Sequence, residues 1–150
     1  EAPFQARSIG AIISSPPYAG TYDYVDHHRL RLAFLGMPFE QFERSEIGAR
    51  RRFKGGRAHH EMQRVFRDFR KTMEGAHEAL SDRGLMALMV GDSVAGVRPV
   101  WADGVVRDVA DGLFDVIAWA GQERDKLGGL EKRAFGDEPK REHIMLLRKR

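Results

Sequence analysis

Apolar runs and apolar stripes alternate along the chain and predict a sheet of four strands with helices between them. The first run, Ile9–Ser14, stops at two prolines, and the second, Leu85–Val90, stops at a glycine, as buried strands do. Because the second run has no polar alternation, we expect that strand to be buried on both faces in a parallel sheet. Residues 115–120 and 142–148 have the composition of a third and a fourth strand.

The helical period is strongest after His59, where apolar residues recur at every third or fourth position and predict one long helix. Its stripe comprises Met62, Val65, Phe66, Phe69, Met73, Ala76 and Leu80. A weaker period predicts a helix over residues 24–35, which ends at Gly36. A third helix is predicted around residues 100–113.

Two stretches, residues 39–56 and 121–141, have no clear period and carry many charges and glycines. We expect both to be loops, the first of them irregular and basic. Because no helix fits in the second, the strands on either side of it are expected to form an antiparallel pair joined by a long loop. The predicted fold class is α/β, as part of a Rossmann-like sheet that is mostly parallel with an antiparallel C-terminal edge hairpin.

Composition limits the class of protein. A chain of 150 residues is long enough for one domain with a substantial core, so residues 1–150 are expected to form a single domain. With no cysteine, disulfides, thiolate metal sites and cysteine nucleophiles are excluded, and the expected location is the cytoplasm. The net charge of +3 and the pI of about 9.4 favour an anionic partner such as nucleic acid. A solvated surface of mixed charge explains them equally well.

Candidate chemistry lies in Ser14-Ser15-Pro16-Pro17-Tyr18, directly after the first strand. Both prolines fix φ and lack an N–H, so the segment is expected to be a rigid loop at the carboxyl end of a strand. It offers a hydroxyl, outward-facing carbonyls and an aromatic ring, at the edge of an open α/β sheet where ligands usually bind. The alternative is a plain surface turn.

The sequence Ser15-Pro16-Pro17-Tyr18 after an apolar strand resembles the catalytic motif of S-adenosylmethionine-dependent amino-methyltransferases. These enzymes methylate an exocyclic amine of cytosine or adenine in DNA, and the serine form of the motif is more typical of cytosine-N4 enzymes. Further stretches that resemble bacterial site-specific DNA methyltransferases are Asp23-Tyr24-Val25, His28-Arg29-Leu30, Leu35-Gly36 and Ile47-Gly48 with Arg51. The predicted strand layout is also similar, so the resemblance extends over most of the chain.

The resemblance implies a role for each residue of the tetrapeptide. The side-chain oxygen of Ser15 and the carbonyl of Pro16 would accept both N–H bonds of the target amine, which aims its lone pair at the methyl sulfonium. Pro17 would keep the loop rigid. Tyr18 would stack on a base that has been flipped out of the duplex.

The cofactor implied by the resemblance is S-adenosylmethionine, and Ser14 and Asp92 are the candidates for contacting it. For Asp92, which follows the second strand, a helix or turn cap is at least as good an explanation. Family members carry a Gly-rich loop for the methionine part of the donor and an acidic residue for its ribose, and this sequence has neither. We therefore expect the C-terminal, catalytic half of a larger methyltransferase domain, whose cofactor half lies in a preceding region or a partner chain.

Candidate contacts to nucleic-acid phosphates are the cations Arg50, Arg51, Arg52 and Lys54. A solvated charged loop is the alternative. No metal is expected, because the histidine pairs at 27–28 and 59–60 point in different directions and lack acidic partners at ligand spacing. Trp101 and Trp119 lie on predicted apolar faces and are expected in the core.

Three functions remain open. The first is methyl transfer to DNA, with cytosine-N4 favoured over adenine-N6. The second keeps the chemistry but changes the substrate to RNA or to an amine of a protein side chain. The third is a non-catalytic α/β domain that binds nucleic acid or takes part in assembly. No membrane partner is expected, because no apolar run in the sequence is long enough to cross a bilayer.

Overall fold

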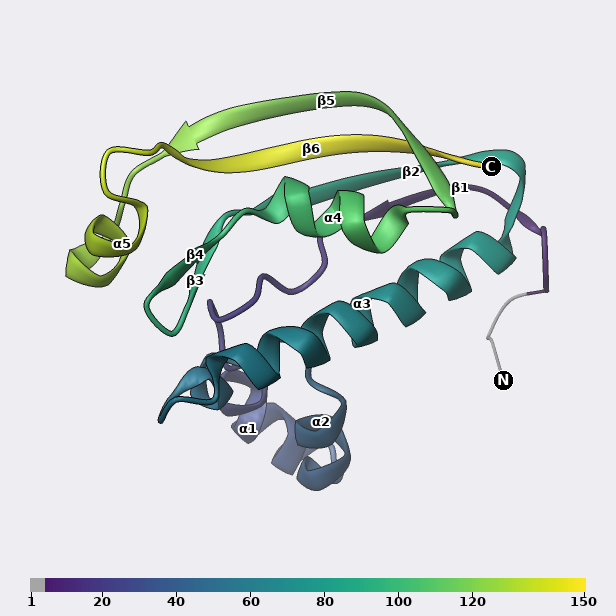
Figure 1. Ribbon diagram of the computed structural model, residues 1–150. Helices are drawn as coiled ribbons and strands as arrows, with labels where there is room; N and C mark the ends of the chain where they lie inside the picture. Colours follow the sequence, from purple (N-terminus) through teal and green to yellow (C-terminus); the bar gives the residue numbers. More distant parts are fainter. Residues whose placement is uncertain (1–4) are drawn as a thin grey trace.

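The computed structural model describes residues 5–150, so the first four residues of the predicted domain lie outside it, and it has a mixed sheet of four strands (Figure 1). Its strands are β1 (Ile9–Ser14), β2 (Leu80–Gly91), β5 (Phe114–Arg124) and β6 (Lys140–Lys149). They lie in the order β1-β2-β6-β5. β1 pairs parallel with β2, whereas β6 runs antiparallel to both β2 and β5.

The predicted antiparallel pairing of the last two strands is confirmed, but the prediction of a mostly parallel sheet is wrong. Three strands, β1, β2 and β5, point the same way, as the prediction requires. The chain then returns through β6, which lies between β2 and β5 and not at an edge. Only the β1–β2 pairing of this sheet is therefore parallel.

Helices and a small hairpin fill the connections. The hairpin consists of β3 (Ser93–Ala95) and β4 (Arg98–Val100). The helices are α1 (Tyr24–Phe34), α2 (Phe39–Ser45), the 3-10 helix η1 (Arg50–Phe53), α3 (Ala58–Ala79), α4 (Ala102–Ala110) and α5 (Gly128–Phe135). Both predicted loops are therefore wrong in part, because residues 39–56 contain α2 and η1, and residues 121–141 contain α5 and the ends of two long strands.

The core lies between one face of the sheet and the helices α3 and α4 (Figure 1). The predicted apolar stripe of α3 is confirmed, since Val65, Phe69 and Met73 are buried. Met73 packs with Leu88 of β2, Met145 and Leu147 of β6 and Val106 of α4, all of them exposed by 1% or less. None of the helices within residues 5–150 is long and apolar enough to cross a membrane.

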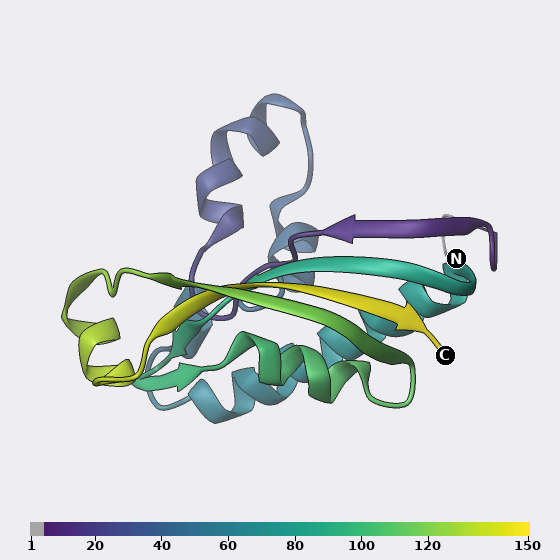
Figure 2. The same ribbon diagram turned by 90° about the horizontal axis from the view of Figure 1, so that it is seen from above.

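No helix within residues 5–150 covers the opposite face of the sheet, which is called the bare face below. On β2, Met86, Leu88 and Val90 are buried, but Leu85 and Met89 are 37% and 41% exposed, so the prediction of burial on both faces is wrong. All helices of the core pack on the same side, so the other face of an apolar strand remains open to solvent. Residues 24–53 form a lobe that stands away from the sheet (Figure 2).

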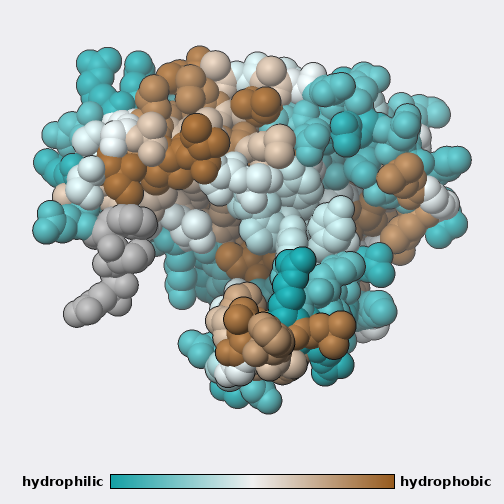
Figure 3. Space-filling model, turned by 180° about the vertical axis from the view of Figure 1, so that it is seen from behind, coloured by the Kyte–Doolittle hydropathy of each residue, from teal (hydrophilic) through white to brown (hydrophobic). Residues whose placement is uncertain are grey.

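Apolar side chains gather on the surface along β1 and again on the lobe (Figure 3). Exposed apolar residues of the bare sheet face include Ile13, Leu85, Met89 and Ile144. Ile13, on the edge strand β1, is 89% exposed. In the lobe, Leu30 and Phe34 are exposed to a similar degree.

Candidate functional site

The Ser-Pro-Pro-Tyr loop and the end of β2 leave the sheet at the same edge. Ser14, the last residue of β1, pairs with Leu88 in parallel register, three residues before β2 ends at Gly91. Carboxyl ends of parallel strands meet at one edge, so the loop after β1 lies beside the turn after β2. In the loop itself, Ser15 is exposed and Tyr18 is half-buried.

Tyr18 is held in place from two sides. Its ring lies so close to Gly91 that a Cβ at Gly91 would be 2.7 Å from the ring carbon Cε2. Its hydroxyl donates a hydrogen bond of 3.1 Å to Oε1 of Glu142, a residue of β6. Burial raises the pKa of Tyr18 above its usual value, the Ser15 hydroxyl lowers it by less, and Glu142 raises it further. Tyr18 therefore stays protonated at neutral pH and can act as a donor.

Asp92 joins three elements at the end of β2. Oδ1 of its carboxylate accepts a hydrogen bond of 2.8 Å from the backbone N–H of Ala102, the first residue of α4, and Oδ2 accepts one of 2.8 Å from the N–H of Arg141. Its Oδ1 also lies 3.1 Å from Nε2 of His143. Asp92 thus binds the first N–H of α4 from ten residues earlier in the chain, whereas the N-cap position of this helix is Trp101. Its contact with a cofactor stays a prediction.

His143 and Trp119 complete this network and were missed by sequence reasoning. Nε1 of Trp119 lies 3.2 Å from Nδ1 of His143, and the two rings are stacked. Because an indole nitrogen can only donate, Nδ1 of His143 must accept, and its proton is therefore on Nε2. That N–H donates to Asp92. A single histidine in an apolar strand gives no signal of this role, since Asp92 lies 51 residues earlier in the chain.

Asp92, Asp103 and His143 place three potential metal-ligand atoms within 4.8 Å of one another. Both carboxylate oxygens of Asp92 already accept hydrogen bonds from this chain. We therefore interpret Asp92 and His143 as part of a buried hydrogen-bond network that fixes the end of β2, with the partly exposed Asp103 beside it.

The tryptophans are more exposed than the sequence predicted. Trp119 is 46% exposed beside His143, and Trp101 is 38% exposed at the start of α4. The prediction that both lie in the core is wrong, because Trp119 lies on β5 at the edge of the sheet and Trp101 is the N-cap residue of α4, directly after the hairpin.

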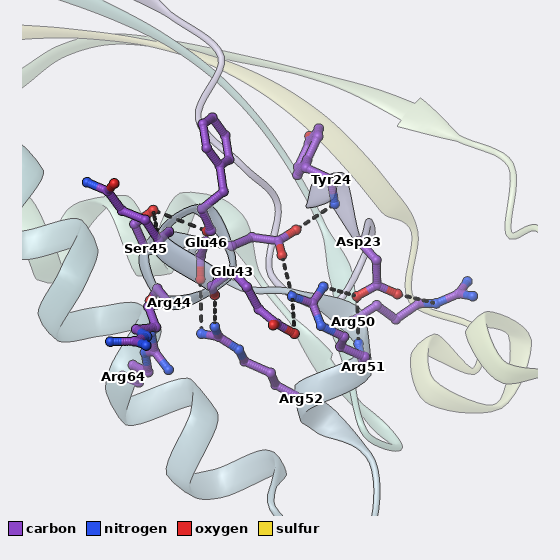
Figure 4. Close-up of polar contacts among 12 residues, drawn as sticks. Asp23, Tyr24, Glu43, Arg44, Ser45, Glu46, Arg50, Arg51, Arg52 and Arg64 are labelled. Atoms are coloured by element: carbon purple, nitrogen blue, oxygen red, sulfur yellow. Dashed lines mark hydrogen bonds and ion pairs between the residues drawn. The ribbon is translucent and has the colours of Figure 1, made fainter. Parts of the chain in front are cut away.

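Two of the four predicted phosphate-binding cations take part in holding the lobe together (Figure 4). The Arg51 guanidinium pairs with Glu46 at 2.8 Å, with Asp23 at 3.3 Å and with Glu43 at 3.4 Å. The Arg52 guanidinium donates to the backbone carbonyls of Glu43 and Glu46 at the end of α2. These contacts link α1, α2 and η1.

The other two cations face solvent. The side chain of Arg50 is 67% exposed and lies 4.0 Å from Asp23, at the limit of an ion pair. Lys54 is exposed in the loop between η1 and α3. Of the four candidates, Arg50 and Lys54 are therefore the better placed to meet a phosphate.

Comparison with known proteins gave matches only among solved structures. No known family and no curated protein matches the sequence. Two crystal structures of a candidate DNA modification methylase from Thermus thermophilus are similar, with 19% and 20% sequence identity and TM-scores of 0.44 and 0.40. Each comparison covers 99% of this chain and 47% or 49% of the other, so the chain spans about half the length of these proteins.

Proposed function

We propose that the chain is the catalytic part of a DNA amino-methyltransferase, which transfers a methyl group from S-adenosylmethionine to an exocyclic amine of a flipped base. Cytosine N4 is favoured over adenine N6 because the motif begins with serine. The observation that carries the proposal is the position of Ser15-Pro16-Pro17-Tyr18 at the carboxyl end of β1, beside its parallel partner β2. This placement and the sequence motif together support the function.

The loop supplies acceptors for the target amine. Ser15 is exposed, so its hydroxyl is accessible to a base, and Pro17 holds the preceding Pro16 in an extended conformation. An exocyclic amine is a poor nucleophile because its lone pair is delocalised into the ring. Two fixed acceptors on its N–H bonds favour a pyramidal nitrogen whose lone pair is directed at the methyl donor.

Tyr18 is proposed to support the flipped base and Pro17 to stiffen the loop. The contact with Gly91 and the hydrogen bond to Glu142 fix the ring before any base arrives. A ring whose position is already fixed loses little conformational freedom when a base stacks on it. Arg50 and Lys54 are proposed to contact DNA phosphates, with Arg51 and Arg52 placing the segment that carries them.

Residues 5–150 do not by themselves fit the methyl donor. Ser14 and Asp92 are the proposed contacts, but both oxygens of Asp92 are occupied by donors of this chain. We propose that the Gly-rich half that holds the donor is supplied by a further region of the same chain or by a partner chain. The bare apolar face of the sheet and the free edge of β1 are the surfaces it would cover.

Replacement of Ser15 by alanine in the complete methyltransferase is expected to lower kcat about tenfold. One neutral hydrogen bond to the reacting amine is worth about 1.4 kcal/mol, which corresponds to that factor. The measurement is transfer of a tritiated methyl group to DNA, RNA and protein in parallel. Ser8→Ala, on the exposed segment before β1, is the matched control and should leave the rate unchanged.

The same assay separates the alternatives. Unchanged transfer to DNA by Ser15→Ala and by Tyr18→Ala would refute the proposed site. Methyl transfer to RNA alone or to protein alone would show that this molecule, and not DNA, is the substrate. The incomplete donor site favours a non-catalytic nucleic-acid-binding or assembly domain as the second candidate function. No transfer to any substrate, with no donor binding by calorimetry, would favour that function instead.

Ile13→Asp tests the proposed contact with the donor-binding half. Because Ile13 is 89% exposed, the free energy of unfolding of the isolated chain should change by less than about 0.5 kcal/mol, as measured in urea. Association with the donor-binding half should weaken, because the new carboxylate would be buried without a partner. Phe34→Asp, at a lobe position that is 91% exposed, is the control and should leave association intact. Equal association of both variants would contradict the proposed contact.

A further inference from the structure

A large cleft lies on the helical side of the sheet, between the first half of α3 and the β3–β4 hairpin. Its volume is 1070 Å³. One wall comprises Lys54, Gly55 and Gly56 with the first two turns of α3, and the other comprises the hairpin and the start of α4. The turn of the hairpin approaches α3 so closely that a Cβ at Gly96 would lie 2.9 Å from Cβ of Ala58. The two walls are thereby fixed relative to each other.

The cleft combines aromatic rings with positive charge. Trp101, Phe66 and Phe53 line it, and the Trp101 ring is held edge-on by the buried Phe135, with a distance of 5.2 Å between centroids. Lys54 and Arg98 add two exposed cations to its lining, and no ion pair of either is found within residues 5–150. Asp108 is the one acidic residue that lines it in this part of the chain. An orientated aromatic ring beside unpaired cations is complementary to a planar ligand that carries negative charge.

The cleft also adjoins the proposed methyl-transfer site. A small cavity of 30 Å³ lies behind the loop and is lined by Pro16, Pro17 and Tyr18. This cavity shares Met62, Val100 and Val105 with the wall of the large cleft. The back of the Ser-Pro-Pro-Tyr loop and the cleft are therefore separated by a single layer of side chains.

We propose that the cleft binds a nucleotide of single-stranded DNA, with the base against Trp101 and the phosphate at Lys54 and Arg98. The inference rests on the proposed function and deepens it, because the strand would be the one that carries the target base. Stacking on an aromatic ring does not depend on base identity, and the two cations contact the phosphates of the DNA backbone. The cleft therefore holds the strand beside the target and does not select its sequence.

The probe is a fluorescein-labelled single-stranded oligodeoxynucleotide of mixed sequence, and its binding to the chain is measured by anisotropy without a methyl donor. Trp101→Leu is expected to raise Kd about tenfold, through loss of base stacking. Lys54→Glu with Arg98→Glu is expected to raise Kd further, and to lower the slope of log Kd against log salt by about 0.7 for each lost phosphate contact. All binding measurements use the full 150-residue chain.

Two further variants separate blockage from misfolding. Gly104 lies on α4 at the wall of the cleft, where an added Cβ would meet no atom within 4 Å. Gly104→Gln should therefore obstruct the cleft while α4 stays folded, and Gly104→Ala, whose side chain is much shorter, should weaken binding less. Lys71→Glu reverses one charge, half the change of the paired variant, at an exposed position of α3 outside the cleft, and log Kd should rise by less than half as much as in the paired variant. Thermal unfolding followed by circular dichroism checks each fold.

The outcomes are separable. Loss of binding in the cleft variants, with a smaller effect in Lys71→Glu, supports the inference. Unchanged binding in Trp101→Leu and Gly104→Gln overturns it, and so does failure of the parent chain to bind the oligonucleotide. Failure of the proposed function is recognised by a different measurement, the unchanged methyl transfer of Ser15→Ala in the complete enzyme.

Discussion

Asp92→Ala is expected to lower the free energy of unfolding by about 3–5 kcal/mol, because it leaves three donors without their acceptor. These donors are the backbone N–H groups of Ala102 and Arg141 and the Nε2–H of His143. Asp92 is 4% exposed, so water cannot readily replace the lost carboxylate. Urea unfolding measures the change, as a lower midpoint at an unchanged m-value.

Two variants show whether the hydrogen bonds are the cause. Asp92→Asn keeps the size but replaces one acceptor oxygen by an amide donor, so its loss should be smaller than that of alanine. Asp103→Asn is the matched control, because Asp103 is partly exposed and lies 3.9 Å from Arg107. Its change should stay below about 1 kcal/mol. A comparably small effect of Asp92→Ala would mean that the network does not hold β2, α4 and β6 together.

Gly91→Val is expected to destabilise the chain by about 3 kcal/mol and to displace Tyr18 from Glu142. The new Cβ would lie 2.7 Å and 3.0 Å from two ring carbons of Tyr18, so the ring or the strand must move. A displaced ring would lose the hydrogen bond between the Tyr18 hydroxyl and Glu142 and would no longer be in position to support the target base. Methyl transfer should therefore fall together with stability. Unfolding in urea and the tritium assay measure the two effects.

Removal of the Tyr18 ring tests whether its collision with the new side chain causes the destabilisation by Gly91→Val. In a Tyr18→Ala background the three ring carbons nearest to the new Cβ of Gly91→Val are absent, so its cost should fall well below that in the parent chain. Gly75→Ala is the control, because Gly75 lies within α3 with no atom within 4 Å of an added Cβ. It should be stabilising by about 0.5–1 kcal/mol. Equal costs of Gly91→Val in both backgrounds would show that the ring is not the constraint.

Elements with a strong local pattern were predicted closely. The structure gives β1 at the expected Ile9–Ser14, and α3 spans Ala58–Ala79, where the apolar stripe lay. Both depend on residues adjacent in sequence, the prolines after the strand and the period of the helix. The two short helices α2 and α5 were missed, because α2 buries no residue and α5 buries Phe135 alone, so neither has an apolar stripe.

The candidate site was predicted in part for the same reason. Two prolines directly after a strand make the following loop rigid whatever the rest of the fold is. The position of Ser15 and Tyr18 at a sheet edge could therefore be predicted. The partners of Tyr18, Gly91 and Glu142, come from other strands and carry no local signal. The basic cluster illustrates the opposite error, since Arg51 and Arg52 looked available in sequence but contact acidic side chains and carbonyls of the lobe.

The sequence alone determined the elements with regular periods and the rigid Ser-Pro-Pro-Tyr loop after β1, because both arise from neighbouring residues and fixed backbone angles. The tertiary structure decided the place of β6 between β2 and β5, the bare face of the sheet and the Asp92–His143–Trp119 network. These features depend on which distant segments meet. An uninterrupted apolar run shows that a strand is apolar on both faces. Only packing decides whether one of these faces or both are covered.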